Sequence, residues 1–163
     1  MVAYHGRMDA PRVMIRPARP SDHAALAHAR VALWPDATLE EHSAELAAIL
    51  SGHQESTLPQ EIFVAESAAG QILGFVDVGL RSHADGCDPR QPVAYIEGWY
   101  VAPDVRRLGI GRALIAAAEA WGRAHGCVEM ASDTWIELDS SQRAHEALGF
   151  TVVDRCVHYR KAL

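Results

Sequence analysis

The stretch from Val101 to Arg112 constrains this chain most, because it joins a strand to a helix through a loop with two glycines. Its sequence is V-A-P-D-V-R-R-L-G-I-G-R, and the residues after it have the apolar spacing of a long helix. The first N–H groups of a helix lack partners within the helix and lie at the positive end of its dipole, so they attract an anion. Glycine lets the backbone approach that anion closely because it has no Cβ. We expect a phosphate-bearing ligand here, held by Arg106, Arg107, Leu108, Gly109, Ile110, Gly111 and Arg112.

Length and composition are those of one ordinary globular domain. The chain has 163 residues, of which 49% are hydrophobic and 22% charged, which is enough to bury a core. Its formal net charge of −6 argues against a nucleic-acid binder, which needs a broad basic surface, and is compatible with a cationic substrate. We expect residues 1–13 to be a flexible N-terminal extension and residues 14–163 to form a single domain.

Nothing in the sequence predicts export, a membrane span or a metal site. The longest apolar runs, such as 72–80, are interrupted by glycine and acid and are too short to cross a bilayer. The first residues lack the apolar core of a signal peptide. Cys87, Cys127 and Cys156 have no metal-binding spacing, and neither do the histidines. We expect a cytoplasmic protein with free thiols and no metal ion.

Apolar periodicity and turn residues predict alternating strands and helices, which is an α/β pattern. Predicted strands begin at Met14 and cover 61–66, 72–80, 93–101, 127–131, 150–156 and 157–161. Predicted helices run from the cap at 21–23 to Trp34, from Thr38 to Gly52, from Gly109 to His125 and from Asp139 or Ser140 to Leu148. The strand 127–131 follows 93–101 after a crossover helix, so these two strands are expected to pair in parallel.

The spacing Arg106-x-x-Gly109-x-Gly111 resembles the pyrophosphate loop of the GNAT N-acetyltransferases. Its context fits as well, because it follows a strand, opens a helix and precedes a Leu-Gly-Phe ending at 148–150. The resemblance covers residues 14–163 and implies a mixed α/β GNAT fold, with a mostly antiparallel central sheet, one parallel and splayed strand pair, and flanking helices. It further implies acetyl-CoA as co-substrate, held by the loop together with Tyr100 and Val101.

Further blocks resemble the aminoglycoside 6'-N-acetyltransferases within that superfamily. They are Leu-Trp-Pro at 33–35, Asp-Gly-Cys-Asp at 85–88, Ile-Glu-Gly at 96–98, and the segments 129–134, 145–150 and 158–161. The resemblance implies direct acetyl transfer to an aminoglycoside without an acyl-enzyme, and a role in antibiotic resistance. It also implies a homodimer with the C-terminal strands near its interface.

Amide formation needs a neutral amine, but most amines are protonated near pH 7. Glu97, in the strand before the loop, is the candidate that binds the ammonium and relays its proton, although it could act only as an electrostatic anchor. Asp133 ends the neighbouring strand, and the resemblance implies that it binds an ammonium; a helix or turn cap is the alternative. Trp34 could offer an apolar face to a sugar ring or pack in the core. Asp77, Asp85, Asp88, Glu137 and Asp139 could extend an acidic funnel, or be solvated carboxylates.

In many GNAT enzymes a tyrosine protonates the departing thiolate of CoA. His145 stands at that position here and is the candidate acid, because histidine side chains titrate near neutral pH; solvent is the alternative. Three other functions remain open from the sequence: a GNAT enzyme for another small amine such as a polyamine or metabolite, a CoA-binding sensor without catalysis, and a protein acetyltransferase with an open groove for a peptide.

Overall fold

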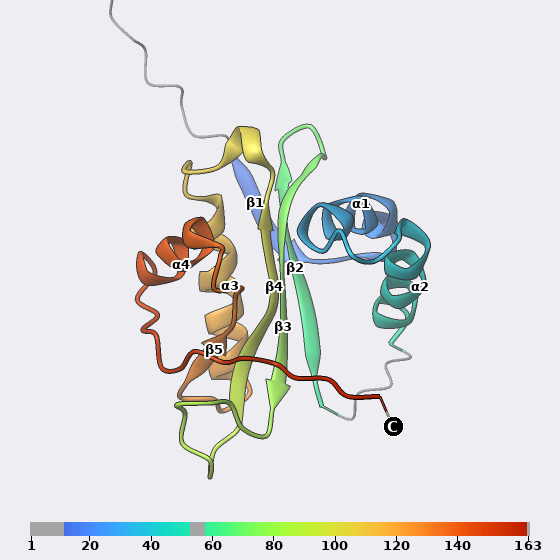
Figure 1. Cartoon of the computed structure of the whole chain (residues 1–163). Helices are drawn as coiled ribbons and strands as arrows, with labels where there is room; N and C mark the ends of the chain where they lie inside the picture. The colour runs from blue at the N-terminus through green and yellow to red at the C-terminus, as the bar shows by residue number, and fades with distance from the viewer. Residues whose placement is uncertain (1–11, 53–57, 163) are drawn as a thin grey trace, which may run out of the picture.

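A computed structural model describes residues 12–52 and 58–162, which form one sheet with helices on both faces (Figure 1). The five-stranded sheet has the order β1-β2-β3-β4-β5. Its strands are β1 (Val13–Pro17), β2 (Gln60–Ser67), β3 (Ile72–Arg81), β4 (Val93–Val101) and β5 (Met130–Ser132). β1 to β4 pair antiparallel, whereas β5 pairs with β4 in parallel, from Ala94 opposite Met130 to Ile96 opposite Ser132. The predicted mixed α/β sheet with a parallel pair is confirmed.

Helices cover both faces of this sheet. α1 (His23–Leu33) and α2 (Leu39–Leu50) lie on one face, and α3 (Ile110–Ala124) and α4 (Asp139–Glu146) lie on the other (Figure 1). None of the described helices is long and apolar enough to cross a membrane. The predicted extension at 1–13 falls mainly on residues outside the described part of the chain, and β1 already begins at Val13.

The apolar side chains of the central strands alternate between two cores, as expected for strands covered on both faces. Phe75 lies with Leu26 and Leu46 beneath α1 and α2, and all three are fully buried. Val76 points the other way and lies with Leu114 beneath α3, where both are fully buried. β3 and β4 therefore have a core on each side, and a functional group on either strand is placed on a rigid element.

Local signals set the ends of α2 and α3, as predicted. The Thr38 hydroxyl accepts the N–H of Glu41, and the Glu41 carboxylate accepts the N–H of Thr38, which completes the predicted capping box. α3 begins after Gly109 and ends before His125. Its buried side chains follow the period of a helix with one face on the core; they are Ile110, Leu114, Ile115 and Ala118.

β5 begins three residues after the start of the predicted strand 127–131, because the residues before β5 form the C-terminal end of α3. Gly126 has a left-handed φ of 81°, and the N–H of Cys127 donates to the carbonyl of Gly122 at 3.0 Å. Backbone committed to this helix ending is not available to the sheet. Only three residues of β5 therefore pair with β4.

The predicted C-terminal strands, 150–156 and 157–161, are wrong. Residues 151–162 are exposed and have no regular secondary structure, although they include Val152, Val153 and Val157, which favour strands. A strand needs a neighbour for its backbone hydrogen bonds, and no strand of the described part pairs with this segment. The segment instead crosses the face of the molecule, and Val153 packs against Gly86 (Figure 1).

We expect Leu114→Ala to lower the free energy of unfolding by about 2–5 kcal/mol, because it leaves a cavity in the core beneath α3. Val128→Ala is the matched control: Val128 is 80% exposed, so its truncation should change that free energy by less than about 0.5 kcal/mol. Urea unfolding followed by circular dichroism measures both variants. Equal stability of the two would contradict the assigned core.

Candidate active site

The loop before α3 has the geometry of an anion site. Gly109 precedes the helix with a left-handed φ of 88°, and no side chain caps the helix. Arg107 also has a positive φ, 64°, which is uncommon for a residue with a side chain. A Cβ on Gly109 would meet nothing within 4 Å, so the space beside the first turn is open. Uncapped N–H groups, the helix dipole and nearby guanidinium groups suit a phosphate there.

The residues predicted for this site, 106–112, have different roles in the structure. Nε of Arg106 donates to the carbonyl of Val101 at 2.9 Å and holds the loop against the end of β4. Arg112 donates to a carbonyl at the end of α4 at 3.3 Å. A Cβ on Gly111 would lie 2.7 Å from the ring of Trp99. The second glycine is therefore required by packing against an indole, rather than by the approach of a ligand.

Tyr100 and Val101, which were predicted to help bind the donor, lie in the two cores. The Tyr100 ring stacks on Phe75 beneath α1, with ring centroids 6.1 Å apart. Val101 packs against the core beneath α3. Because both side chains pack against the cores, only the backbone groups of these two residues remain to contact a donor.

Glu97 is the extra residue of a β-bulge in β4. Asp77 is opposite Gly98 and Val78 is opposite Ile96, which leaves Glu97 without a partner in β3. Side chains normally alternate along a strand, but the bulge puts both Glu97 and Gly98 on the α1 side of the sheet. It also interrupts the ladder, so backbone polar groups become available to a ligand at this point.

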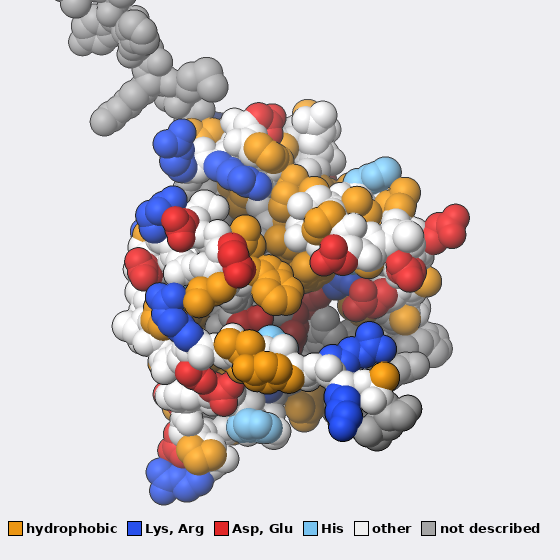
Figure 2. Space-filling model, viewed as in Figure 1, with side chains coloured by type: hydrophobic (Ala, Val, Ile, Leu, Met, Phe, Trp, Pro, Cys, Tyr) orange, Lys and Arg blue, Asp and Glu red, His pale blue; other side chains and the backbone are white. Residues whose placement is uncertain are grey.

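A cleft of about 490 Å³ lies beside Glu97, between the helices α1 and α2 and the strands β3 and β4. Its lining includes Arg30, Trp34, Glu45, Gln60, Asp77 and Glu97. Figure 2 shows this face of the molecule hollowed near its centre, with acidic side chains inside the hollow. Trp34 and Glu97 are brought together as predicted, whereas Asp133 does not line the cleft.

A buried ion pair lies in this cleft. Arg30 on α1 contacts the carboxylate of Asp77 on β3 at 2.5 Å, and their side chains are 2% and 1% exposed. Gln60 donates to the other Asp77 oxygen at 2.6 Å, and the carboxylate of Glu45 lies 2.9 Å from Arg30. Burial raises the pKa of Asp77, and the nearby Arg30 and Gln60 oppose that rise. Asp77 was expected either to extend an acidic funnel or to be a solvated carboxylate, but it is a buried acid paired with Arg30.

Trp34 packs in the core and also lines the cleft. Its ring packs directly over Gly98, where a Cβ would overlap it. Nε2 of His42 donates to the Trp34 carbonyl at 3.1 Å, and the guanidinium of Arg30 lies 5.3 Å from the indole centroid. The indole packs against its neighbours and also forms a wall of the cleft.

Asp133 directly follows β5 and is exposed, and the hydroxyl of Tyr95 donates to it at 2.6 Å. Burial and this carboxylate raise the pKa of Tyr95, so the phenol remains protonated as a donor. Arg81 lies over the Tyr95 ring, 3.4 Å from its centroid, and donates to both oxygens of Glu97 at 2.9 and 2.6 Å. Glu97 and Asp133 are thus linked through Arg81 and Tyr95.

His145 on α4 lies beside the ends of β4 and β5. Its ring makes an edge contact with Trp99, with centroids 5.5 Å apart, and its Nε2 lies 3.0 Å from the Ser132 hydroxyl. Nδ1 lies 2.8 Å from the carbonyl of Ser141. Because a carbonyl only accepts, Nδ1 must carry a proton, and Nε2 can accept from Ser132 or, when protonated, donate to it.

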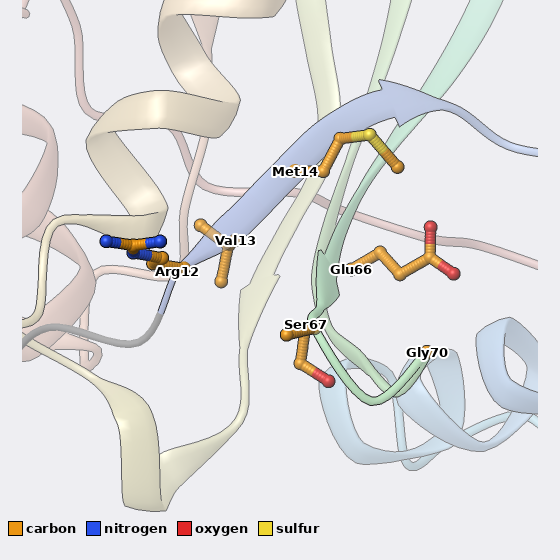
Figure 3. Close-up of a pocket in the computed structure, with 7 residues that line it drawn as sticks. Arg12, Val13, Met14, Glu66, Ser67 and Gly70 are labelled. Atoms are coloured by element: carbon orange, nitrogen blue, oxygen red, sulfur yellow. The ribbon is translucent and has the colours of Figure 1, made fainter.

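A second depression, of about 410 Å³, lies where β1 meets the turn between β2 and β3 (Figure 3). It is lined by Arg12, Val13, Met14 and the end of β2 at Glu66 and Ser67. The Glu66 carboxylate already forms an ion pair with Arg16 at 2.6 Å. This depression offers no free acid beside an anion site, so it is not the candidate site.

Known proteins match both the sequence and the fold. A model of the acetyltransferase (GNAT) family matches residues 23–150. The chain belongs to the GNAT family. Aminoglycoside N(6')-acetyltransferase type 1 of Klebsiella aerogenes is 42% identical over 150 residues, covering 92% of this chain and 97% of that protein. The protein of the same name from Stenotrophomonas maltophilia is 41% identical over 91% of this chain and 93% of its own length.

Solved structures of the GNAT family agree. AAC(6')-Iy in complex with the bisubstrate analogue CoA-S-monomethyl-acetylneamine has a TM-score of 0.82 and 35% identity, covering 93% of this chain and 99% of that one. AAC(6')-Ih from Acinetobacter baumannii has a TM-score of 0.81 and 28% identity over 93% and 99% of the two chains. The predicted GNAT fold is confirmed.

Several residues of this GNAT site escaped the sequence reasoning. Arg30, Gln60, Arg81 and Tyr95 were not singled out. One signal was available for Asp77, because an acid inside the apolar run 72–80 must find a buried partner. Its partner lies 47 residues away on a helix, and no local pattern predicts that contact.

We expect Arg30→Met to lower the free energy of unfolding by about 3–5 kcal/mol, because it leaves the Asp77 carboxylate buried without its cation. The double variant Arg30→Met/Asp77→Leu should recover most of that loss, since neither charge is then left unpaired. Urea unfolding measures both. An Arg30→Met protein as stable as the wild type would show that the pair does not hold α1.

Proposed function

We propose that this GNAT protein transfers the acetyl group of acetyl-CoA directly to the 6'-amino group of aminoglycoside antibiotics and so confers resistance. The observation that carries the proposal is the position of Glu97, which the bulge sets in an acidic cleft walled by Trp34. The strand that bears Glu97 also leads into the anion loop. The names of the relatives support the proposal, because both are aminoglycoside N(6')-acetyltransferases.

The donor side consists of the loop at 106–112 and the ends of β4 and β5. The uncapped first turn of α3 binds the pyrophosphate of CoA, and arginine side chains of the loop add positive charge. Ile96 and Ser132 are the last paired residues of the two parallel strands, and ligands bind beyond the carboxyl ends of such strands. Backbone amides of β4 there polarise the thioester carbonyl and stabilise the oxyanion.

The acceptor side is the acidic cleft. Glu97 binds the ammonium and takes a proton from it, directly or through water, so that the amine attacks as a neutral nucleophile. Asp133 and Glu45 supply further negative charge to a polycation, and the Trp34 indole offers an apolar face to a sugar ring. Direct attack joins nitrogen to the acetyl carbon and breaks the C–S bond, whose electron pair remains on sulfur, and the attacking nitrogen releases its second proton to water.

His145 returns a proton to that sulfur through Ser132. In protonated His145, Nε2 donates to the Ser132 oxygen, and the Ser132 hydroxyl proton passes to the thiolate. The Ser141 carbonyl keeps the ring oriented through Nδ1. This arrangement gives histidine the role that tyrosine has in many GNAT enzymes.

The homodimer and the cytoplasmic location expected from the sequence belong to the same proposal. The segment 151–162 is exposed and contains Val152, Val153 and Val157, which suits pairing with a sheet of a second copy. The three cysteines are free thiols, which suits a reducing compartment.

The function is tested by measuring thiol release from acetyl-CoA with kanamycin, neamine and spermidine as acceptors. We expect a kcat/KM at least about tenfold higher for the aminoglycosides than for spermidine. Turnover of spermidine with none of any 6'-amino aminoglycoside would favour an enzyme for another small amine. Tight CoA binding without transfer to any acceptor would favour a sensor.

Glu97→Gln should lower kcat/KM for kanamycin by about 10²–10⁴-fold, because the amide cannot take a proton from the amine. CoA affinity, measured by calorimetry, should be unchanged. Asp139→Asn is the matched control, since it removes the same charge from a side chain that is 79% exposed on α4. Unchanged acetylation in Glu97→Gln would remove Glu97 from the site.

His145→Gln and Ser132→Ala should each lower the single-turnover rate by roughly 10–100-fold, because both interrupt one proton path. The double variant should be no slower than the slower single variant, as expected for residues that act as a unit. Acceptor KM should change little. Wild-type rates in both single variants would show that solvent protonates the thiolate.

A further inference from the structure

Arg81, the last residue of β3, already occupies the carboxylate assigned to the acceptor amine. Its Nε donates to one oxygen of Glu97 at 2.9 Å and its terminal nitrogen donates to the other at 2.6 Å. A two-pronged contact of this kind is the strong form of an arginine–carboxylate pair. Glu97 therefore has a cation on both of its oxygens before any substrate arrives.

The same guanidinium lies between the two acids of the acceptor side. It lies over the ring of Tyr95, 3.4 Å from the centroid, and the hydroxyl of that ring donates to Asp133 at 2.6 Å. A guanidinium on an aromatic face is stabilised by the quadrupole of the ring. Arg81 thus occupies the place where a cationic group would contact Glu97 and approach Asp133.

This contact is open enough to be exchanged. The side chains of Arg81 and Glu97 are 44% and 32% exposed, so water can solvate both charged groups when the pair separates. The pair of Arg30 and Asp77 nearby is almost fully buried, so it is not exchangeable in the same way. Of these two ion pairs at the cleft, the Arg81 pair is the one that an incoming ammonium can replace.

We propose that Arg81 is an internal cation that competes with the acceptor for Glu97, so that every acceptor amine binds there only by displacing it. A single ammonium then replaces one ion pair by another and gains little. A polycation must displace the same guanidinium, and its further ammonium groups gain from Glu45 in the lining of the cleft. The inference rests on the proposed function, because it takes Glu97 as the acceptor carboxylate.

Arg81→Gln tests this proposal against the control Arg90→Gln. Arg90 has the same charge and pairs with Asp88, but it is 85% exposed and lies outside the cleft. Acceptors are kanamycin and methyl 6-amino-6-deoxyglucoside, a sugar with a single amine. We expect Arg81→Gln to lower the KM of both acceptors by a similar factor, about tenfold, because each amine must displace the same guanidinium. Arg90→Gln should change neither KM.

Arg81→Lys should retain most of the wild-type KM for both acceptors, because it keeps a cation beside Glu97. Unchanged KM values in Arg81→Gln would overturn the proposal, and so would an equal fall of kcat for both acceptors at constant KM, which would make Arg81 a residue that only positions Glu97. Calorimetric binding of the two amines reports the same competition without chemistry. If the wild type acetylates neither amine, the proposed function fails, and the calorimetric affinities of the wild type and Arg81→Gln still decide for or against Arg81.

Discussion

The buried pair of Arg30 and Asp77 is the interaction on which the acceptor cleft depends. It joins α1 to the central strand β3 where both side chains are almost without solvent. Two ions in such a place are stable only in close contact, so the position of the helix on the sheet is narrowly set. Trp34 directly follows α1, and its backbone N–H donates to the backbone carbonyl of Arg30 at 2.7 Å. The pair therefore also fixes the indole that walls the cleft.

The bulge in β4 supplies the other half of this geometry. One unpaired residue turns Glu97 and Gly98 toward the same side of the sheet. Gly98 admits the Trp34 ring because it has no Cβ, and Glu97 projects beside it into the cleft. With a regular strand, the acid or the glycine would face α3, and either the carboxylate or the indole would lose its place.

The sequence predicted correctly those parts of the fold that depend only on residues close together in the chain. The capping box at Thr38, the glycine before α3 and the helical period after it depend on neighbours in sequence, and each was predicted correctly. The bulge depends on the register of β3 against β4, and the partners of Asp77 and Glu97 come from other elements. Gly111 is another case that depends on a distant residue. Its spacing in the loop predicted contact with a ligand, but in the structure it packs against the indole of Trp99.

The donor side and the acceptor side of the site meet at β4, because one face of this strand packs against the α3 layer and the other against the α1 layer. Trp99 faces α3 and contacts His145, whereas Glu97 and Gly98 face α1 and the cleft. A donor held at the α3 loop can reach an amine in the cleft only where the sheet is open beside β4. β5 leaves that opening, because its pairing with β4 ends at Ser132 opposite Ile96. A longer β5 would continue the ladder past Ile96 and separate the anion loop from Glu97. The early end of the parallel pair is therefore as necessary to the proposed transfer as the bulge itself.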